Sequence, residues 1–255
     1  MNESERRREP PVALVTGGAV RVGRAISLAL AAAGYELAVH YRASEEPARS
    51  LARHLEAEGV QCHMVQGDLA DAEAPDAIIS SVEDAFGRLD LLVNSAALFD
   101  AGPLLDIDAR SWDRVMAVNV RAPHLLVRAA AALLEAGEGG CVVNIVDLSA
   151  FQPWTGYPHH AVSKAALAHL TRVQARAMAP RVRVNAVAPG AVLPPEDYPE
   201  ARVRALRDAA PLQALGSPED VADAVVYLAG ARFVTGHILV VDGGRLLGPS
   251  GPPGE

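Results

Sequence analysis

A glycine-rich turn near the amino terminus constrains the fold more strongly than any other feature. Residues 12–16 form a short apolar run, glycines stand at positions 17, 18 and 23, and an alanine-rich stretch over residues 22–33 follows. Glycine allows a sharp turn and a close approach to phosphate, while a helix start offers unpaired N–H groups and a positive dipole end. This order of strand, turn and helix predicts a βαβ unit that binds a dinucleotide, with a tight turn that binds nothing as the alternative.

The rest of the chain repeats the alternation of strand and helix. Short runs rich in Val, Ile and Leu alternate with longer alanine-rich stretches. Strands this apolar are buried on both faces, which is typical of a parallel sheet between two layers of helices. We therefore predict an α/β fold of the doubly wound (Rossmann) type, with a mostly parallel, seven-stranded sheet and helices on both faces. The predicted strands are residues 12–16, 36–41, 61–66, 89–93, 141–146, 183–187 and 238–241.

Local signals mark the ends of elements and of the folded part. Gly34 suits the left-handed end of the first helix, and Ser217 suits the N-cap of a late helix. Residues 191–208 are the least predictable internal stretch, because three prolines interrupt any early helix, and a segment there could move over a substrate.

The two ends of the chain differ in composition from its middle. Residues 1–10 and 248–255 are rich in charge, Pro or Gly and cannot bury enough surface to be ordered alone. We therefore predict a flexible tail at each end and a single domain over residues 11–247.

Charge and hydropathy exclude several classes of protein. The net charge is -8 and no dense Lys/Arg tract occurs, which argues against a nucleic-acid partner and favours a small molecule. No apolar run approaches the ~18 to 20 residues needed to span a membrane, and the charged start is unlike a signal peptide, so we predict a cytoplasmic protein. Cys62 and Cys141 lie far apart, and His159 and His160 lack further ligands at zinc spacing, so we expect buried reduced thiols and no metal.

The turn and a series of later motifs resemble the short-chain dehydrogenase/reductase family. The family's turn reads Thr-Gly-x-x-x-Gly-x-Gly, and this chain matches it except at the middle glycine, where Arg21 stands. The resemblance covers residues 12–247 and implies the fold and a nicotinamide cofactor. The later motifs are Asp68-Leu69, Asn94-Ser95-Ala96-Ala97, Asn119, Pro189-Gly190 and Asp242-Gly243-Gly244.

Two arginines indicate NADP(H) as the cofactor. Pteridine reductases of this family also carry arginine at the position of Arg21, where it reaches toward the extra phosphate. A guanidinium binds a phosphate through two parallel hydrogen bonds, and Arg42 stands where NAD enzymes commonly have an acid. Solvated surface arginines are the alternative. The resemblance implies that the cofactor contacts Gly17, Arg21, Val22, Gly23, Tyr41, Arg42, Ser44, Asp68, Leu69, Asn94, Ala96, Lys164, Pro189 and Gly190.

The catalytic residues of the family are only partly present. The family uses a Ser, a Tyr and, four residues after the Tyr, a Lys; here Lys164 is present, but His160 replaces the Tyr and Asp147 replaces the Ser. Pteridine reductases also carry Asp at that position, and they stack a pterin on a phenylalanine that Phe99 matches. The alternatives are that Phe99 fills the core and that Asp147 caps a helix or a turn.

Histidine can replace tyrosine as an acid-base group, because its reference pKa near 6.5 lies closer to neutral pH. We therefore hypothesise that Asp147 and His160 titrate as a coupled pair and deliver a proton, with Lys164 holding the ribose and Asn119 serving a structural and relay role. Tyr157 is a further candidate for substrate binding, with a hydroxyl that could substitute for the missing one.

The combined interpretation is an NADPH-dependent oxidoreductase that transfers hydride to a C=N or C=O group, with a pterin or dihydropteridine as favoured substrate. The alternatives are an NADP(H)-binding sensor or scaffold that lost catalysis, and an alcohol or ketone dehydrogenase. The family resemblance also implies a homotetramer or homodimer.

Overall fold

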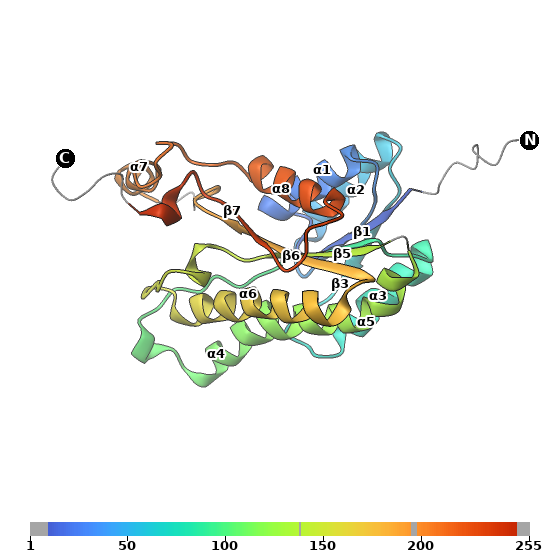
Figure 1. The fold of residues 1–255 in the computed structure, drawn as a ribbon, viewed down its shortest axis with the longest axis horizontal. Coiled ribbons are helices and arrows are strands. Elements are labelled where there is room, and N and C mark those ends of the chain that lie inside the picture. Colours follow the sequence, from blue (N-terminus) through green and yellow to red (C-terminus); the bar gives the residue numbers. More distant parts are fainter. Residues whose placement is uncertain (1–9, 138, 195–197, 249–255) are drawn as a thin grey trace, which may run out of the picture.

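The computed structural model describes residues 10–137, 139–194 and 198–248, and these form one parallel seven-stranded sheet between two layers of helices (Figure 1). The predicted tails therefore lie almost wholly outside the described residues, as does Pro195 in the proline-containing segment. The strand order is β3-β2-β1-β4-β5-β6-β7. The strands are β1 (Val12–Val15), β2 (Glu36–Tyr41), β3 (Cys62–Gln66), β4 (Leu91–Asn94), β5 (Gly140–Ile145), β6 (Val182–Pro189) and β7 (Ile238–Val241).

The two helical layers bury both faces of the sheet, as the apolar strands predict. On one face lie α1 (Arg21–Ala32), α2 (Glu45–Ala57) and α8 (Pro218–Gly230), and on the other lie α3 (Ala74–Phe86), α5 (Ala122–Ala136) and α6 (Pro158–Met178) (Figure 1). Alternate residues of the central strands enter opposite cores: Val15 packs with the first layer and Leu14 with the second, and both are fully buried.

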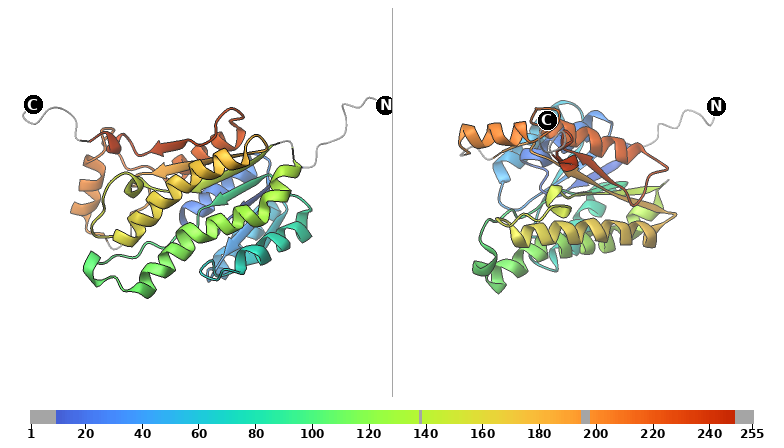
Figure 2. Two further views of the ribbon diagram at one scale, coloured as in Figure 1. Left: turned by 60° about the horizontal axis from the view of Figure 1, so that its bottom comes forward. Right: turned by 60° about the vertical axis from the view of Figure 1, so that its left-hand side comes forward.

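Two further helices are shorter than those of the two layers. Helix α4 (Ala109–Met116) continues through a π-helical turn at Ala117–Arg121 into α5, and α7 (Glu200–Asp208) begins directly after Pro199. In every view α7 lies beside the C-terminal turn Arg245–Leu247 (Figure 2). No helix among the described residues is both long and apolar enough to span a membrane.

The sheet order changes direction at β1, which pairs with β2 on one side and β4 on the other. In doubly wound folds, ligands bind at the carboxyl ends of the strands at such a point. The glycine-rich turn follows β1 and residues 95–98 follow β4, so the fold itself places both segments at this crevice.

The predicted strands are all present, with shifts at their ends that are ordinary for pattern-based boundaries. The largest differences are at β4, which begins two residues later than predicted, and at β6, which extends to Pro189 because that residue still pairs with Val241 of β7. Ser217 caps α8 as predicted and forms a capping box with Asp220. The prediction that both thiols are buried is wrong for Cys62, which is only half-buried because β3 is an edge strand.

Candidate active site

A cleft of about 360 Å³ lies at the carboxyl ends of β1, β2, β3 and β4. Its walls come from the glycine-rich turn, the end of β2, the segment after β3 and the segment after β4. Ten of the predicted cofactor-binding residues line it: Gly17, Arg21, Val22, Gly23, Tyr41, Arg42, Ser44, Asp68, Leu69 and Ala96.

The glycines of the turn are required by close backbone contacts. A Cβ atom on Gly23 would lie 2.1 Å from the carbonyl oxygen of Gly17, so α1 reaches the turn only if this residue is glycine. Gly17 has a φ of +63°, and a Cβ there would lie 3.1 Å from the Cα of Ala96. The turn is therefore packed against both the start of α1 and the segment after β4.

Arg21 has a backbone conformation that normally favours glycine. Its φ is +50°, in the left-handed region that costs a residue with a Cβ roughly 1 to 2 kcal/mol. Its side chain lines the cleft, and its Nη2 donates a 2.8 Å hydrogen bond to the carbonyl of Leu193. Residues in strained backbone conformations cluster at functional sites, so this conformation makes Arg21 a candidate functional residue.

His40 is a part of the cleft whose role the sequence did not indicate. The backbone N–H of Gly17 donates to Nδ1 of His40 at 3.2 Å, and Nε2 lies 3.2 Å from the carbonyl of Gly67, to which it donates. Burial lowers the pKa of His40 to about 4, against smaller opposing effects of Gly67 and Asp68. A neutral histidine thus connects the glycine-rich turn to the end of β3.

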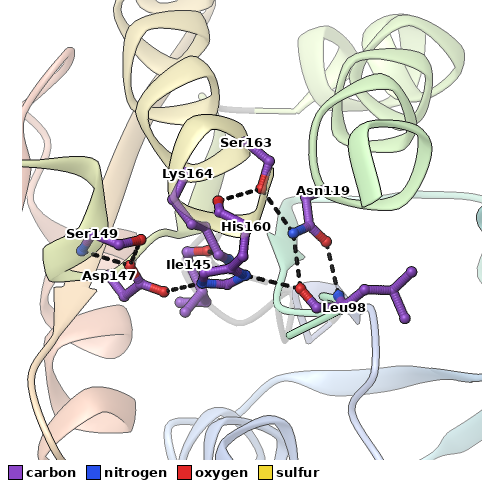
Figure 3. Close-up of polar contacts among 8 residues, drawn as sticks. All are labelled: Leu98, Asn119, Ile145, Asp147, Ser149, His160, Ser163 and Lys164. Atoms are coloured by element: carbon purple, nitrogen blue, oxygen red, sulfur yellow. Dashed lines mark hydrogen bonds and ion pairs between the residues drawn. The ribbon is translucent and has the colours of Figure 1, made fainter. Parts of the chain in front are cut away.

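The two residues predicted to titrate as a coupled pair, Asp147 and His160, are in direct contact. His160 lies in the first turn of α6 and is 1% exposed, while Asp147 directly precedes the short helical turn Leu148–Ala150 after β5. Their atoms Nε2 and Oδ2 are 2.6 Å apart (Figure 3). The other ring nitrogen of His160, Nδ1, donates to the carbonyl of Leu98 at 2.9 Å.

Asp147 is held from two sides. Both the backbone N–H and the hydroxyl of Ser149 donate to its Oδ1, so Asp147 also caps the turn, as the alternative interpretation had it. Burial alone would raise the pKa of Asp147, but hydrogen bonds from His160 and Ser149 and the charges of Lys164 and His160 outweigh burial and lower it. The carboxylate form is therefore favoured.

Lys164 lies one helical turn after His160 and is 4% exposed. Its Nζ donates a 2.7 Å hydrogen bond to the carbonyl of Ile145 at the end of β5. Burial lowers the pKa of Lys164, and the nearby charge of Asp147 opposes that shift. The lysine is therefore a buried amine beside the Asp147–His160 pair, and its burial disfavours the charged form.

Asn119 and Ser163 position the backbone that His160 contacts. The Nδ2 of Asn119 donates to the carbonyl of Leu98 at 3.0 Å and to the hydroxyl of Ser163 at 2.9 Å, while its Oδ1 accepts from the N–H of Leu98. Ser163 in turn donates to the carbonyl of His160 at 2.6 Å (Figure 3). The π-helical turn before α5 brings Asn119 to this contact, which the sequence could not specify.

Aromatic rings lie beside the pair. Phe99 is 46% exposed, so it does not fill the core, and its ring stacks on Tyr157 with centroids 4.3 Å apart. The edge contact between Phe99 and His160 spans 4.7 Å between centroids. The hydroxyl of Tyr157 lies 3.3 Å from that of Tyr198, just before α7.

Some predicted residues lie outside the cleft lining. The Asn94 side chain is buried and donates to Asn144 on the neighbouring strand at 2.8 Å, which connects β4 to β5. Pro189 and Gly190 lie at the end of β6, where a Cβ on Gly190 would be 2.8 Å from Asp242. Their cofactor contacts, like that of Lys164, stay predictions. Within the described ranges, no group of three or more His, Cys, Asp or Glu residues could hold a metal.

Known proteins resemble this chain over most of its length. Residues 18–245 match a family model described as enoyl-(acyl carrier protein) reductase. An uncharacterized oxidoreductase of Mycobacterium tuberculosis is 39% identical over 93% of both chains, and a 3-oxoacyl-(acyl-carrier-protein) reductase of Staphylococcus aureus is 33% identical over 92% of this chain and 98% of that protein. The crystal structure of FolM alternative dihydrofolate reductase 1 from Brucella canis complexed with NADP is similar, with a TM-score of 0.87 and 34% identity over 96% of this chain and 98% of that one.

Proposed function

The chain belongs to the short-chain dehydrogenase/reductase family, and on that premise we propose that it is an NADPH-dependent reductase of a C=N bond in a flat nitrogen heterocycle. A pterin or dihydropteridine is the favoured substrate. The contact between Asp147 and His160 carries this proposal, because it supplies a proton where the family's tyrosine is missing.

The cleft fits NADP(H). The backbone N–H groups at the start of α1 and the glycines before it suit a pyrophosphate, and Arg21 and Arg42 provide cations for the extra phosphate at the cleft wall. Ser44 adds a hydroxyl at the same wall. When bound, the nicotinamide supplies the hydride. The similar structure from Brucella canis, which holds NADP, supports this assignment.

The Asp147–His160 pair favours a C=N bond over a ketone. The family's Ser and Tyr offer two hydroxyl donors to a carbonyl oxygen, whereas an ionised Asp147 accepts hydrogen bonds and would repel that oxygen. A heterocycle with a ring N–H beside a C=N bond presents a donor to the carboxylate as well as the atom to be protonated. The ring of Phe99, which is 46% exposed, suits contact with a planar ring.

The family also forms oligomers, and we infer that this chain is a homodimer or homotetramer. Helix α6 exposes two valines, Val162 and Val173, which are 46% and 51% exposed in one chain. Sedimentation equilibrium of the purified protein measures the mass of the assembly, and a monomer at micromolar concentration would contradict this inference.

The direct test is NADPH oxidation by the purified protein with dihydrobiopterin, dihydrofolate and simple ketones, together with titrations of NADPH and NADH binding. We expect turnover with the dihydropteridines, little with the ketones, and tighter binding of NADPH than of NADH. Turnover with ketones alone would contradict the substrate class and favour an alcohol or ketone dehydrogenase. Tight NADPH binding without any turnover would contradict the enzyme and favour a sensor or scaffold.

A further inference from the structure

We propose that Asp147, not the histidine at the family's tyrosine position, is the residue that touches the substrate and hands over the proton. His160 then acts through Asp147 as a positioning residue that stores the proton. This inference rests on the proposed reductase function and assigns the two members of the pair different roles.

The first step of the argument is the tautomer of His160. The atom 2.9 Å from its Nδ1 is the backbone carbonyl oxygen of Leu98, which can only accept a hydrogen bond. Nδ1 must therefore carry a proton. The same carbonyl also accepts from Asn119, and the N–H of Leu98 donates back to that asparagine, so the acceptor is held in place.

The second step is the proton count at the other nitrogen. Nε2 and Oδ2 of Asp147 are 2.6 Å apart, a distance that requires one proton between them. The pair is therefore either an imidazolium with a carboxylate or a neutral imidazole with a carboxylic acid. Both forms hold one transferable proton, and neither ring nitrogen of His160 is left to meet a substrate.

The third step is access. The side chain of His160 is 2% exposed, whereas that of Asp147 is 19% exposed. Ser149 occupies Oδ1 with two hydrogen bonds, and Oδ2 faces His160 but retains a second position from which a proton taken from Nε2 can be donated to a substrate nitrogen. Within the pair, only Asp147 can reach a bound ring without a rearrangement of α6.

The chemical step then balances. The C=N π bond breaks as a C–H bond forms with a hydride from NADPH, which is oxidised, while the substrate is reduced. The ring nitrogen forms its N–H bond with the proton that Oδ2 delivers. The pair is left as the Asp147 carboxylate and a neutral His160 protonated at Nδ1, and it regains one proton from solvent.

Two variants separate the roles of the pair through their pH profiles. In Asp147→Asn, the amide cannot release a proton, so we expect kcat to fall about 10²- to 10⁴-fold at every pH. In His160→Gln, the amide still reaches Asp147 but stores no proton, so we expect a low kcat at neutral pH that rises as the pH falls and Asp147 itself becomes protonated. Among the described residues, Lys164 on α6 is the further titratable group whose charge acts on Asp147, and both variants retain it.

Matched controls exclude general effects of the substitutions. Asp76→Asn removes a carboxylate that pairs with Arg128 on the surface, and His63→Gln removes a half-buried histidine that contacts Ser81. Both should keep the wild-type pH profile. NADPH titration of each variant reports whether the fold and the cofactor cleft persist. The proposal would be overturned if the Asp147→Asn variant keeps its turnover. It would also be overturned if the His160→Gln variant stays folded but is inactive even at acid pH.

The tautomer is measurable without any cofactor or substrate. In ¹⁵N-labelled wild-type protein, His160, assigned by comparison with His160→Gln, should show a protonated Nδ1 at every pH at which the protein is folded. A bare Nδ1 at high pH would refute the role of Leu98. If the wild type oxidises NADPH with none of the substrates, the proposed function fails, and this measurement still decides whether the pair is arranged as inferred.

Discussion

The backbone N–H of Gly17 donates a hydrogen bond to Nδ1 of His40, so a histidine on β2 determines the shape of the glycine-rich turn after β1. This bond requires a neutral imidazole, because a protonated Nδ1 would present a hydrogen to the N–H group. The conformation of the turn therefore depends on the protonation state of the buried His40.

The first prediction concerns the pH dependence of stability. The pKa of His40 is about 4 in the folded state, below the value of about 6.5 expected when unfolded, so the unfolded chain binds more protons between these values. The contribution of the neutral His40 to the free energy of unfolding is fully present above pH 6.5. It is lost as the pH falls toward 4, and the loss is about 3 kcal/mol at most. Urea unfolding of wild type and His40→Asn across this range measures the difference. Equal slopes of unfolding free energy against pH in the two proteins would contradict the prediction.

The second prediction concerns the contact between the turn and α1. In Gly23→Ala the new Cβ would lie 2.1 Å from the Gly17 carbonyl, so the backbone must shift. We expect a loss of about 1 to 3 kcal/mol in unfolding free energy and weaker NADPH binding. Gly230→Ala is the control, because nothing lies within 4 Å of a Cβ at that helical position. If both variants bind NADPH equally, the turn is not packed as described.

The third prediction separates the charge of Arg21 from its backbone. Both Arg21→Gly and Arg21→Ala remove the guanidinium, and we expect each to lose about tenfold or more in the preference for NADPH over NADH. Only glycine relieves the left-handed φ of +50°, so Arg21→Gly should be more stable than Arg21→Ala by about 1 kcal/mol. Cofactor titrations and thermal unfolding measure these effects. An unchanged cofactor preference in both would show that Arg21 does not contact the phosphate.

The fourth prediction concerns the replacement of His160 by the tyrosine that the family resemblance leads one to expect there. The site is closed around the imidazole, which is 1% exposed and bonded at both nitrogens. We expect His160→Tyr to lower both turnover and stability, the latter by about 1 to 3 kcal/mol, because a larger ring overfills this space and Asp147 loses its proton store. Steady-state kinetics of the variant provide the measurement. A large gain in turnover would mean that the natural protein is an impaired catalyst.

The fifth prediction concerns the aromatic platform. Replacing Phe99 by leucine keeps an apolar side chain but removes the flat ring, so we expect KM for a dihydropteridine to rise about 2- to 10-fold with a smaller change in kcat. Phe233→Leu is a matched control on a fully exposed phenylalanine. The same KM in Phe99→Leu as in wild type would exclude stacking of the substrate on this ring.

Much of the cofactor cleft could be predicted from local patterns. One short segment holds Gly17, Arg21 and Gly23, and its order of strand, turn and helix determines its backbone conformation. The structure places these residues at one wall of the cleft. The end of β2 follows for the same reason, because parallel strands present their carboxyl ends at one edge. His40 was missed because its role depends on Gly17 and Gly67, which lie in the segments that follow two other strands.

The sequence by itself determined the alternating strands and helices, the glycine-rich turn and the presence of Asp147, His160 and Lys164 at spacings that resemble the family's catalytic set, because periodicity and motif spacing are local properties of the chain. Only the tertiary structure decided that Asp147 and His160 lie 2.6 Å apart and that the carbonyl of Leu98 fixes the histidine tautomer. That carbonyl carries no side-chain signal, and it meets His160 across 62 residues of chain. Its position depends on β4, the π-helical turn and α6 packing together, and hydrogen-bond geometry of this kind arises only when separate elements meet.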